Sequence, residues 1–180
     1  MSQPGHQAVS QPGHQAVSQP GNIAPGEKSP EERLAALGLT LPKVTAPLAA
    51  YLPAVRTGDY VYTAGQLPFV DGVLPATGKV GAEVGTAEAS ALARICALNA
   101  LTAVASVTGG LSAVRRIVKL TGFVASAPDF TAQAQVVNGA SELLIEVLGE
   151  PGRHARSAVG MAVLPLDTPV EVELIAEVRG

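Results

Sequence analysis

The chain has 180 residues, a length that suits one domain with its own core better than two. Hydrophobic residues make up 47% of it and aromatic residues only 3%, so we expect a core of Ala, Val and Leu. A net charge of −3 with 15% charged residues excludes the strongly basic surface that binds nucleic acid or anionic membranes. The low charge content also suggests that partner subunits cover part of the surface.

The cysteine content and the hydrophobic pattern exclude two further classes of protein. The single cysteine, Cys96, rules out an internal disulfide and an all-cysteine metal site. No uninterrupted apolar stretch approaches the length of about 18 residues that would suggest a membrane span. The chain starts with polar residues and shows no signal sequence, so we expect a cytoplasmic protein.

The first 28 residues contain an internal repeat. The octapeptide at Ser2–Val9 recurs at Ser10–Val17, and both copies are rich in Gln, Pro, Gly and Ser. Such residues bury too little apolar surface to offset the entropy of ordering, so residues 1–28 are predicted to be a disordered, low-complexity tail. His6 and His14 supply too few ligands for a metal site. Residues 29–180 then form a single domain.

Order is expected to begin at Ser29, which with Glu32 forms a capping box and predicts a short helix at Pro30–Leu37. The residue pattern then predicts a strand at Ala49–Arg56, a turn, and a second strand at Tyr60–Gln66 that makes a hairpin with the first. Residues 67–81, rich in Pro and Gly, are predicted to be a loop.

The middle of the chain alternates between helical and strand patterns. Glu83–Thr108 is predicted to be a long helix ended by two glycines, and it contains Cys96, which we interpret as a small core residue. A strand at Val114–Ala125 and a second helix at Thr131–Leu148 follow. With two C-terminal strands, the order becomes β-β-α-β-α-β-β. This order predicts an α+β fold with two helices packed on one side of a mixed sheet.

The C-terminal third carries the charges that suggest chemistry. Arg156 opens an otherwise small and apolar run, and Glu171 and Glu173 stand two residues apart, on one face of the last strand. If these two strands pair through the turn at Pro165–Pro169, a guanidinium and a carboxylate lie near each other. That pair suits binding of an acidic substrate and activation of a water molecule. An ordinary cross-strand ion pair would give the same pattern.

Three stretches together resemble the Rid family of reactive intermediate deaminases (RidA/YjgF, also described as endoribonuclease L-PSP). They are Tyr51 with Thr63–Pro68, Asn138–Ser141, and Ala155–Pro165 with Val170–Glu173, and the resemblance covers roughly residues 45–178. It implies a chorismate-mutase-like homotrimer with a pocket at each subunit interface. It also implies hydrolysis of 2-imino or enamine acids to 2-keto acids and ammonia, with no cofactor and no metal.

The resemblance assigns roles to particular residues. It implies that Arg156 binds the substrate carboxylate, that Glu171 positions the attacking water, and that Tyr51 lines the pocket. Backbone groups around Gly65 and Ala158 complete the cradle. A planar guanidinium matches a carboxylate in two parallel hydrogen bonds, and a glutamate near it should stay ionised.

Other polar residues near these stretches leave alternatives open. Asn138 and Gln66 could donate hydrogen bonds to a ligand, and Glu173 could replace Glu171 because both leave the same face. His154 could be an acid or base, although a histidine in a Gly-rich turn is more often a solvated loop residue.

The chain differs from the best-characterised branch of that family at two pocket positions. Ala64 stands where that branch has a serine, and Ala158 where it has a cysteine. These differences indicate a divergent branch. Three hypotheses follow: an imine or enamine hydrolase, a trimer that binds a small carboxylate without turnover, and a ribonuclease. The acidic net charge and scarce aromatic residues argue against the third.

Overall fold

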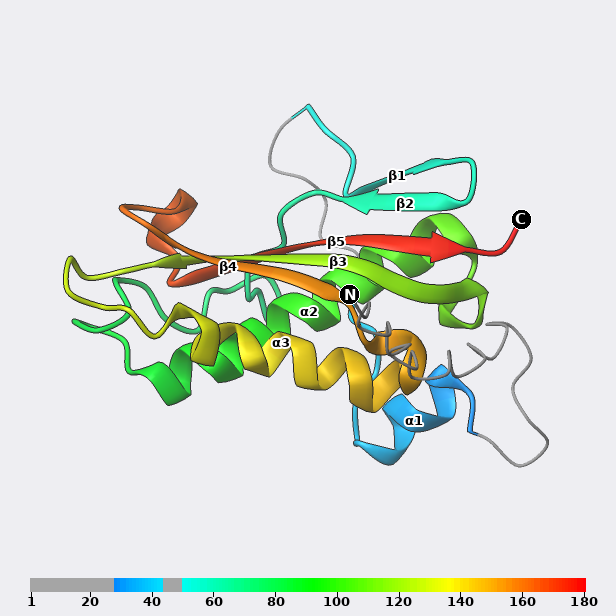
Figure 1. Cartoon of the computed structure of the whole chain (residues 1–180), viewed down its shortest axis with the longest axis horizontal. Coiled ribbons are helices and arrows are strands. Elements are labelled where there is room, and N and C mark those ends of the chain that lie inside the picture. Colours follow the sequence, from blue (N-terminus) through cyan, green and yellow to red (C-terminus); the bar gives the residue numbers. More distant parts are fainter. Residues whose placement is uncertain (1–27, 44–49) are drawn as a thin grey trace, which may run out of the picture.

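The computed structural model describes residues 28–43 and 50–180, so residues 1–27 of the predicted tail and the predicted strand start at Ala49 lie outside them. The described residues form one mixed sheet in the order β1-β2-β5-β3-β4, with α2 and α3 packed together on one face (Figure 1). The predicted α+β fold and the order β-β-α-β-α-β-β are confirmed. The elements are α1 (Pro30–Ala36), β1 (Ala54–Thr57), β2 (Tyr60–Thr63), α2 (Thr86–Thr108), β3 (Val114–Ala125), α3 (Gln133–Leu148), β4 (Ala155–Met161) and β5 (Val170–Val178).

Helix α1 forms as its capping box predicts. The Ser29 hydroxyl accepts a hydrogen bond from the Glu32 backbone at 3.1 Å, and the Glu32 carboxylate accepts one from the Ser29 backbone at 2.7 Å. The Glu31 carboxylate reaches across the domain and accepts hydrogen bonds from the backbone of Leu111 and Ser112, at 3.0 and 3.2 Å. These bonds tie α1 to the turn that leads into β3.

Helix α2 is the central helix of the core. It starts three residues after the predicted Glu83 and ends where Gly109 takes a left-handed conformation, with φ of 79°. By length and composition α2 passes the test for a membrane span, yet half of its most apolar window is buried inside the domain. Cys96 is fully buried within α2, and burial raises the pKa of its thiol well above its usual range, which fits a core residue.

The two C-terminal strands do not pair with each other, so the predicted hairpin is wrong. β4 runs parallel to β3, with Leu120 opposite Arg156, whereas β5 lies antiparallel along the other side of β3, with Phe123 opposite Glu171. The helix α3 makes the crossover that a parallel pair such as β3 and β4 needs. The connection from β4 to β5 therefore spans two strand spacings, about 10 Å, instead of one.

The hairpin of β1 and β2 is confirmed, although both strands are shorter than predicted. After β2 ends at Thr63, the chain returns to the sheet at Gln66, whose backbone exchanges two hydrogen bonds with Val172 of β5, at 2.8 and 3.1 Å. The interruption places Gly65 beside the first residues of β5. It thereby brings one of the residues singled out from the sequence against Glu171.

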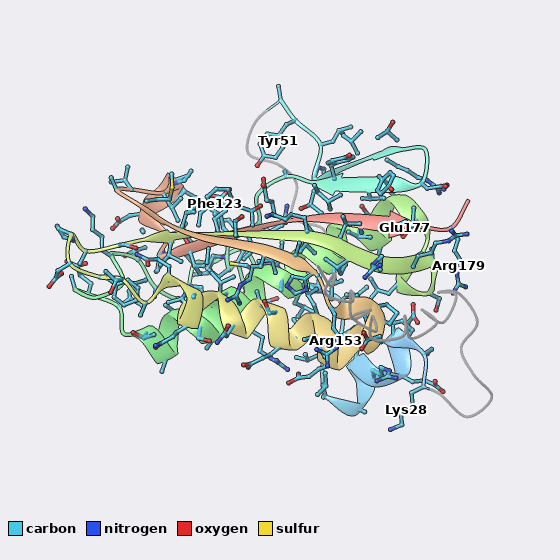
Figure 2. The ribbon with its side chains drawn as sticks, viewed as in Figure 1. Lys28, Tyr51, Phe123, Arg153, Glu177 and Arg179 are labelled. Carbon is cyan, nitrogen blue, oxygen red and sulfur yellow. The ribbon has the colours of Figure 1, made fainter. Side chains whose placement is uncertain are left out.

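The sheet has one face covered by helices and one left open in the single chain. Along β5 every second residue is buried on the side of α2, as at Val172 and Leu174, and the residues between them face the other way. In Figure 2, Phe123 projects from the sheet on the side away from the helices. Glu171 is its neighbour in the register and shares that open face.

Candidate active site

Arg156 lies on the helix-covered side of β4 and is held there by α3. Its Nη1 donates to Asn138 Oδ1 at 2.8 Å and to Ser141 Oγ at 3.1 Å. Its Nη2 donates to the backbone carbonyl of Ala134 at 3.3 Å. The partly buried guanidinium is therefore fixed by three contacts that all come from one helix.

The sequence of α3 explains why one helix can hold the arginine. Residues 134, 138 and 141 are spaced by four and three positions, so they share one face of the helix. That face lies close to the sheet because Gly122 of β3 has no side chain. A Cβ at this glycine would lie 2.5 Å from a methyl carbon of Val137, so a larger residue would push α3 away from β4.

None of the described residues neutralises the charge of Arg156. Its three acceptors are an amide, a hydroxyl and a backbone carbonyl, and it forms no ion pair with any residue that the structure describes. A guanidinium has five N–H groups, so Nε–H and one N–H of Nη2 remain for another partner. A partly buried cation with spare donors suits an anionic ligand.

His154 and Ser141 form a second layer beneath the arginine. The His154 ring lies 2.6 Å from the carbonyl of Gly152 through Nδ1 and 3.1 Å from the Ser141 hydroxyl through Nε2. Burial lowers the pKa of His154, the hydrogen bond to Gly152 raises it, and the charge of Arg156 lowers it; the net pKa lies below the usual value. His154 is thus not the solvated loop residue that its Gly-rich surroundings suggest.

Glu171 lies on the open face of the sheet, packed over Gly65. A Cβ placed on Gly65 would overlap the Glu171 carboxylate, with only 1.6 Å to its Oε1, so the glycine is what leaves room for this side chain. Burial raises the pKa of Glu171, and the negative charge of Glu173 two residues along raises it further. The sequence predicts an arginine beside this carboxylate that keeps it ionised, but within one chain no arginine contributes to the pKa of Glu171.

Arg156 and Glu171 are not brought together in a single subunit. They stand on strands separated by β3, and the register puts Arg156 beside the buried Leu120 and Glu171 beside Phe123 of the open face. The two charges therefore leave opposite faces of the sheet. The cross-strand ion pair considered from the sequence does not form within the chain.

The remaining predicted residues divide between the same two faces. Ala158 follows Arg156 on the helix side of β4, opposite Gly122, and packs against the core. Tyr51 is half exposed and lies on the open side, away from α2 and α3 (Figure 2). Glu173 shares the open face with Glu171 but lies opposite Thr121.

The two candidate ligand donors are partly engaged within the chain. The Gln66 side-chain amide donates a hydrogen bond to the backbone carbonyl of Ala64 at 3.2 Å. Asn138 uses its carbonyl oxygen to hold Arg156, which leaves its N–H groups for a ligand. Asn138 can therefore hold Arg156 through its oxygen and donate to a ligand through its nitrogen at the same time.

Ser141 is a residue of this arrangement to which the sequence analysis assigned no role. In the sequence Ser141 stands three positions after Asn138, in a helix that also carries other polar residues such as Gln135 and Glu142. That spacing alone places it on the same helix face as the asparagine. Its partners on β4 and at His154 depend on how α3 lies across the sheet, which the local sequence does not specify.

Comparison with known proteins places this arrangement in a family. The family described as "YjgF/chorismate mutase-like, putative endoribonuclease" matches residues 31–178. Protein TCP17 of Trypanosoma cruzi is 44% identical over 147 residues, which cover 81% of this chain and 92% of that protein. The crystal structure of Atu1372, a protein with unknown function from Agrobacterium tumefaciens, is similar with a TM-score of 0.78 and 48% identity, covering 83% of this chain and 92% of that one.

A third relative carries a description of activity. TdcF of Escherichia coli, described as a "putative reactive intermediate deaminase", is 31% identical over 129 residues, covering 72% of this chain and 87% of that protein. Its crystal structure with bound serine has a TM-score of 0.57 and 26% identity, covering 77% of this chain and 94% of that one. By the extent of the family match and by these relatives, the chain belongs to the YjgF/RidA family.

Proposed function

We propose that the protein hydrolyses 2-imino or enamine acids to 2-keto acids and ammonia, with Arg156 as the carboxylate anchor and Glu171 as the base. The observation that carries the proposal is the unneutralised Arg156 guanidinium, held by three uncharged groups with two N–H donors to spare. The description of TdcF as a deaminase supports the same reaction class.

We further propose that the complete site forms between two copies of the chain in a homotrimer. Arg156, Asn138 and Ala158 would come from one subunit, and Tyr51, Gly65 and Glu171 from its neighbour. Two observations support this division: one chain holds the two charges on opposite faces of its sheet, and its open face carries large apolar side chains that are exposed. Val55, Tyr60 and Tyr62 are 51%, 43% and 46% exposed there.

The chemistry assigned to each group is simple. Arg156 binds the substrate carboxylate and orients the C=N bond, and the Glu171 carboxylate takes a proton from a water whose oxygen attacks C2. The electron pair of the C=N bond moves to nitrogen, and Glu171 returns the proton to that nitrogen. The carbinolamine hydroxyl then passes its proton to the Glu171 carboxylate, which transfers it to the leaving nitrogen. The C–N bond breaks as the carbonyl forms, which gives the 2-keto acid and ammonia. The raised pKa of Glu171 makes it a better base than an ordinary carboxylate.

The first test measures ammonia release from imino acids that an amino-acid oxidase generates in the assay. The wild type should accelerate imine decay, and Arg156→Ala and Glu171→Ala should each lose about 100-fold or more of that acceleration. Glu173→Gln serves as the matched control on the same strand face. If the wild type accelerates decay of no imino acid but binds the keto-acid product in an Arg156-dependent way, the protein is a carboxylate-binding trimer without turnover, as the alanines at positions 64 and 158 would favour.

The shared site has its own test, which mixes the two inactive variants. In a co-expressed trimer of Arg156→Ala and Glu171→Ala subunits, about a quarter of the sites would combine an intact Arg156 with an intact Glu171 from the neighbour. Activity should therefore recover to about a quarter of the wild-type value. A mixture that stays as inactive as its parents would show that both residues act from the same subunit.

A further inference from the structure

We propose that Ser141 and His154 are positioning residues that hold Arg156 in its ligand-binding orientation. The inference rests on the proposed function, because it concerns the same arginine. Ser141 contacts Arg156 directly, whereas His154 reaches it only through the Ser141 hydroxyl.

The hydrogen bonds around His154 fix which ring nitrogen carries the proton. The Gly152 carbonyl can only accept, so the Nδ1 that lies 2.6 Å from it must be the donor. In the neutral ring Nε2 then carries a lone pair. At 3.1 Å from this lone pair, the Ser141 hydroxyl donates its hydrogen to the ring.

This assignment also fixes how Ser141 faces the arginine. With its hydrogen directed at His154, the hydroxyl oxygen presents lone pairs to Arg156 Nη1 at 3.1 Å. A serine hydroxyl without such an acceptor rotates and presents its hydrogen as readily as its lone pairs. His154 therefore makes Ser141 a permanent acceptor for the guanidinium.

His154 is itself held by the backbone carbonyl of Gly152, which lies in a tightly packed turn. Gly152 lies in the short helical turn at Glu150–Gly152, pressed against the C-terminal half of α3. A Cβ on Gly152 would lie 2.2 Å from the carbonyl oxygen of Leu144, so the turn has no room to shift. By contrast, Asn138, the other side chain that holds Arg156, lies on the exposed surface of α3.

Two pairs of variants test the chain of hydrogen bonds that runs from His154 through Ser141 to Arg156. Each pair contains one substitution that breaks this chain and one that keeps it. Ser141→Ala removes the acceptor, whereas Ser141→Thr retains a hydroxyl. His154→Asn can still donate to Gly152 but is too short to reach Ser141, whereas His154→Gln places an acceptor near the position of Nε2. The double variant Ser141→Ala/His154→Asn should lose no more than either single change if both residues act through one contact.

Two readouts are taken on each full-length variant. The first is the NMR order parameter of the Arg156 Nε–H group in the free protein, which should fall from a rigid to a flexible value in Ser141→Ala and His154→Asn and stay high in Ser141→Thr and His154→Gln. The second is the dissociation constant for pyruvate, the shortest 2-keto acid product, with pyruvamide as the uncharged control. It should rise about tenfold in the two breaking variants.

The outcomes separate this inference from the proposed function. If the wild type shows no Arg156-dependent binding of pyruvate, the proposed function fails, while the order parameter still decides whether Ser141 and His154 hold the arginine. If the order parameter of Arg156 is unchanged in Ser141→Ala and His154→Asn, the positioning role is wrong. A fall in order without a change in pyruvate affinity would also overturn it.

Discussion

Glu171 carries a cost to folding that follows from its position. Burial and the charge of Glu173 raise its pKa in the folded chain above the ordinary value of 4.5. A raised pKa in the folded state means that the native protein favours the protonated carboxyl. The resulting stability is fully present below pH 4.5 and is lost as the pH rises through the folded-state pKa.

The substitution Glu171→Gln should therefore stabilise the protein in a pH-dependent way. At pH 7.5 the variant should melt about 2–4 °C above the wild type, because the amide avoids the desolvation of a charge. Below pH 4.5 the two proteins should melt together, and this comparison is the internal control. Calorimetry at the two pH values measures the difference in melting temperature between the variant and the wild type. An equal difference at both pH values would show that the charge of Glu171 is not its cause.

Gly65 offers a way to move Glu171 without altering it. Gly65 has an ordinary negative φ, so alanine is tolerated by the backbone, but the new methyl would occupy the place of the carboxylate oxygen. Because a glutamate side chain can swing aside, Gly65→Ala should lower kcat about as much as Glu171→Ala while changing stability by less than about 1 kcal/mol. Steady-state kinetics and urea unfolding measure the two effects. A large loss of stability would show that the loop, and not the carboxylate, had moved.

At the scale of elements, the contact between α2 and α3 depends on Gly139. A Cβ there would lie 2.0 Å from the backbone carbonyl oxygen of Ser90, so the two helices touch through their backbones. Alanine in place of glycine normally stabilises a helix by about 1 kcal/mol. Gly139→Ala should instead destabilise the protein by about 3 kcal/mol, because the helices must separate.

Urea unfolding measures this change, with Gln135→Ala as the control on the exposed side of the same helix. The control should stay within about 0.5 kcal/mol of the wild type. If Gly139→Ala proved as stable as the control, the close approach of α2 and α3 would be wrong.

The elements differ in how far the sequence could predict them. The predicted and observed bounds of β3 agree, because the residues of its second half alternate between buried and partly exposed positions, as a strand with one covered face requires. The start of α1 was equally clear, since its capping box acts locally. The pairing of β4 and β5 was not predictable in this way: a Pro-containing connection resembles a hairpin turn, but the parallel crossover through α3 puts β3 between them.

The same distinction applies to the site residues. Arg156, Asn138, Gly65 and Glu171 were identified from the sequence, and the structure shows that Asn138 contacts Arg156 and that Gly65 contacts Glu171. The prediction from the sequence that Arg156 and Glu171 lie near each other is wrong within one chain. Their placement depends on the order of the strands in the sheet, which local sequence does not determine. The roles of these residues in catalysis stay predictions until the variants are measured.

At the scale of the whole molecule, the open sheet face should decide assembly. Tyr62 lies on this face between Val55 and Ile175, its register partners on β1 and β5. Tyr62→Glu should weaken assembly by about 2 kcal/mol or more per contact, because it places a charge in an apolar interface. Sedimentation should show the wild type at three times the 18.2 kDa of one chain and the variant as a monomer.

Leu37→Glu provides the matched control for assembly. This leucine is also exposed and directly follows α1, a helix that lies on the side of the sheet covered by α2 and α3 (Figure 1). It should leave the mass of the particle unchanged. Dissociation by both variants would mean that charge alone, and not the open face, controls assembly.

The placement of Arg156 and Glu171 on opposite faces has a consequence for kinetics in dilute solution. In the proposed arrangement each copy contributes half of two different sites and contains no complete one, so neighbours must meet head to tail and close a ring. Below the concentration at which that ring dissociates, the rate should fall more steeply than the amount of protein. The apparent order of the reaction in protein would then exceed one, and dilution alone would switch the activity off.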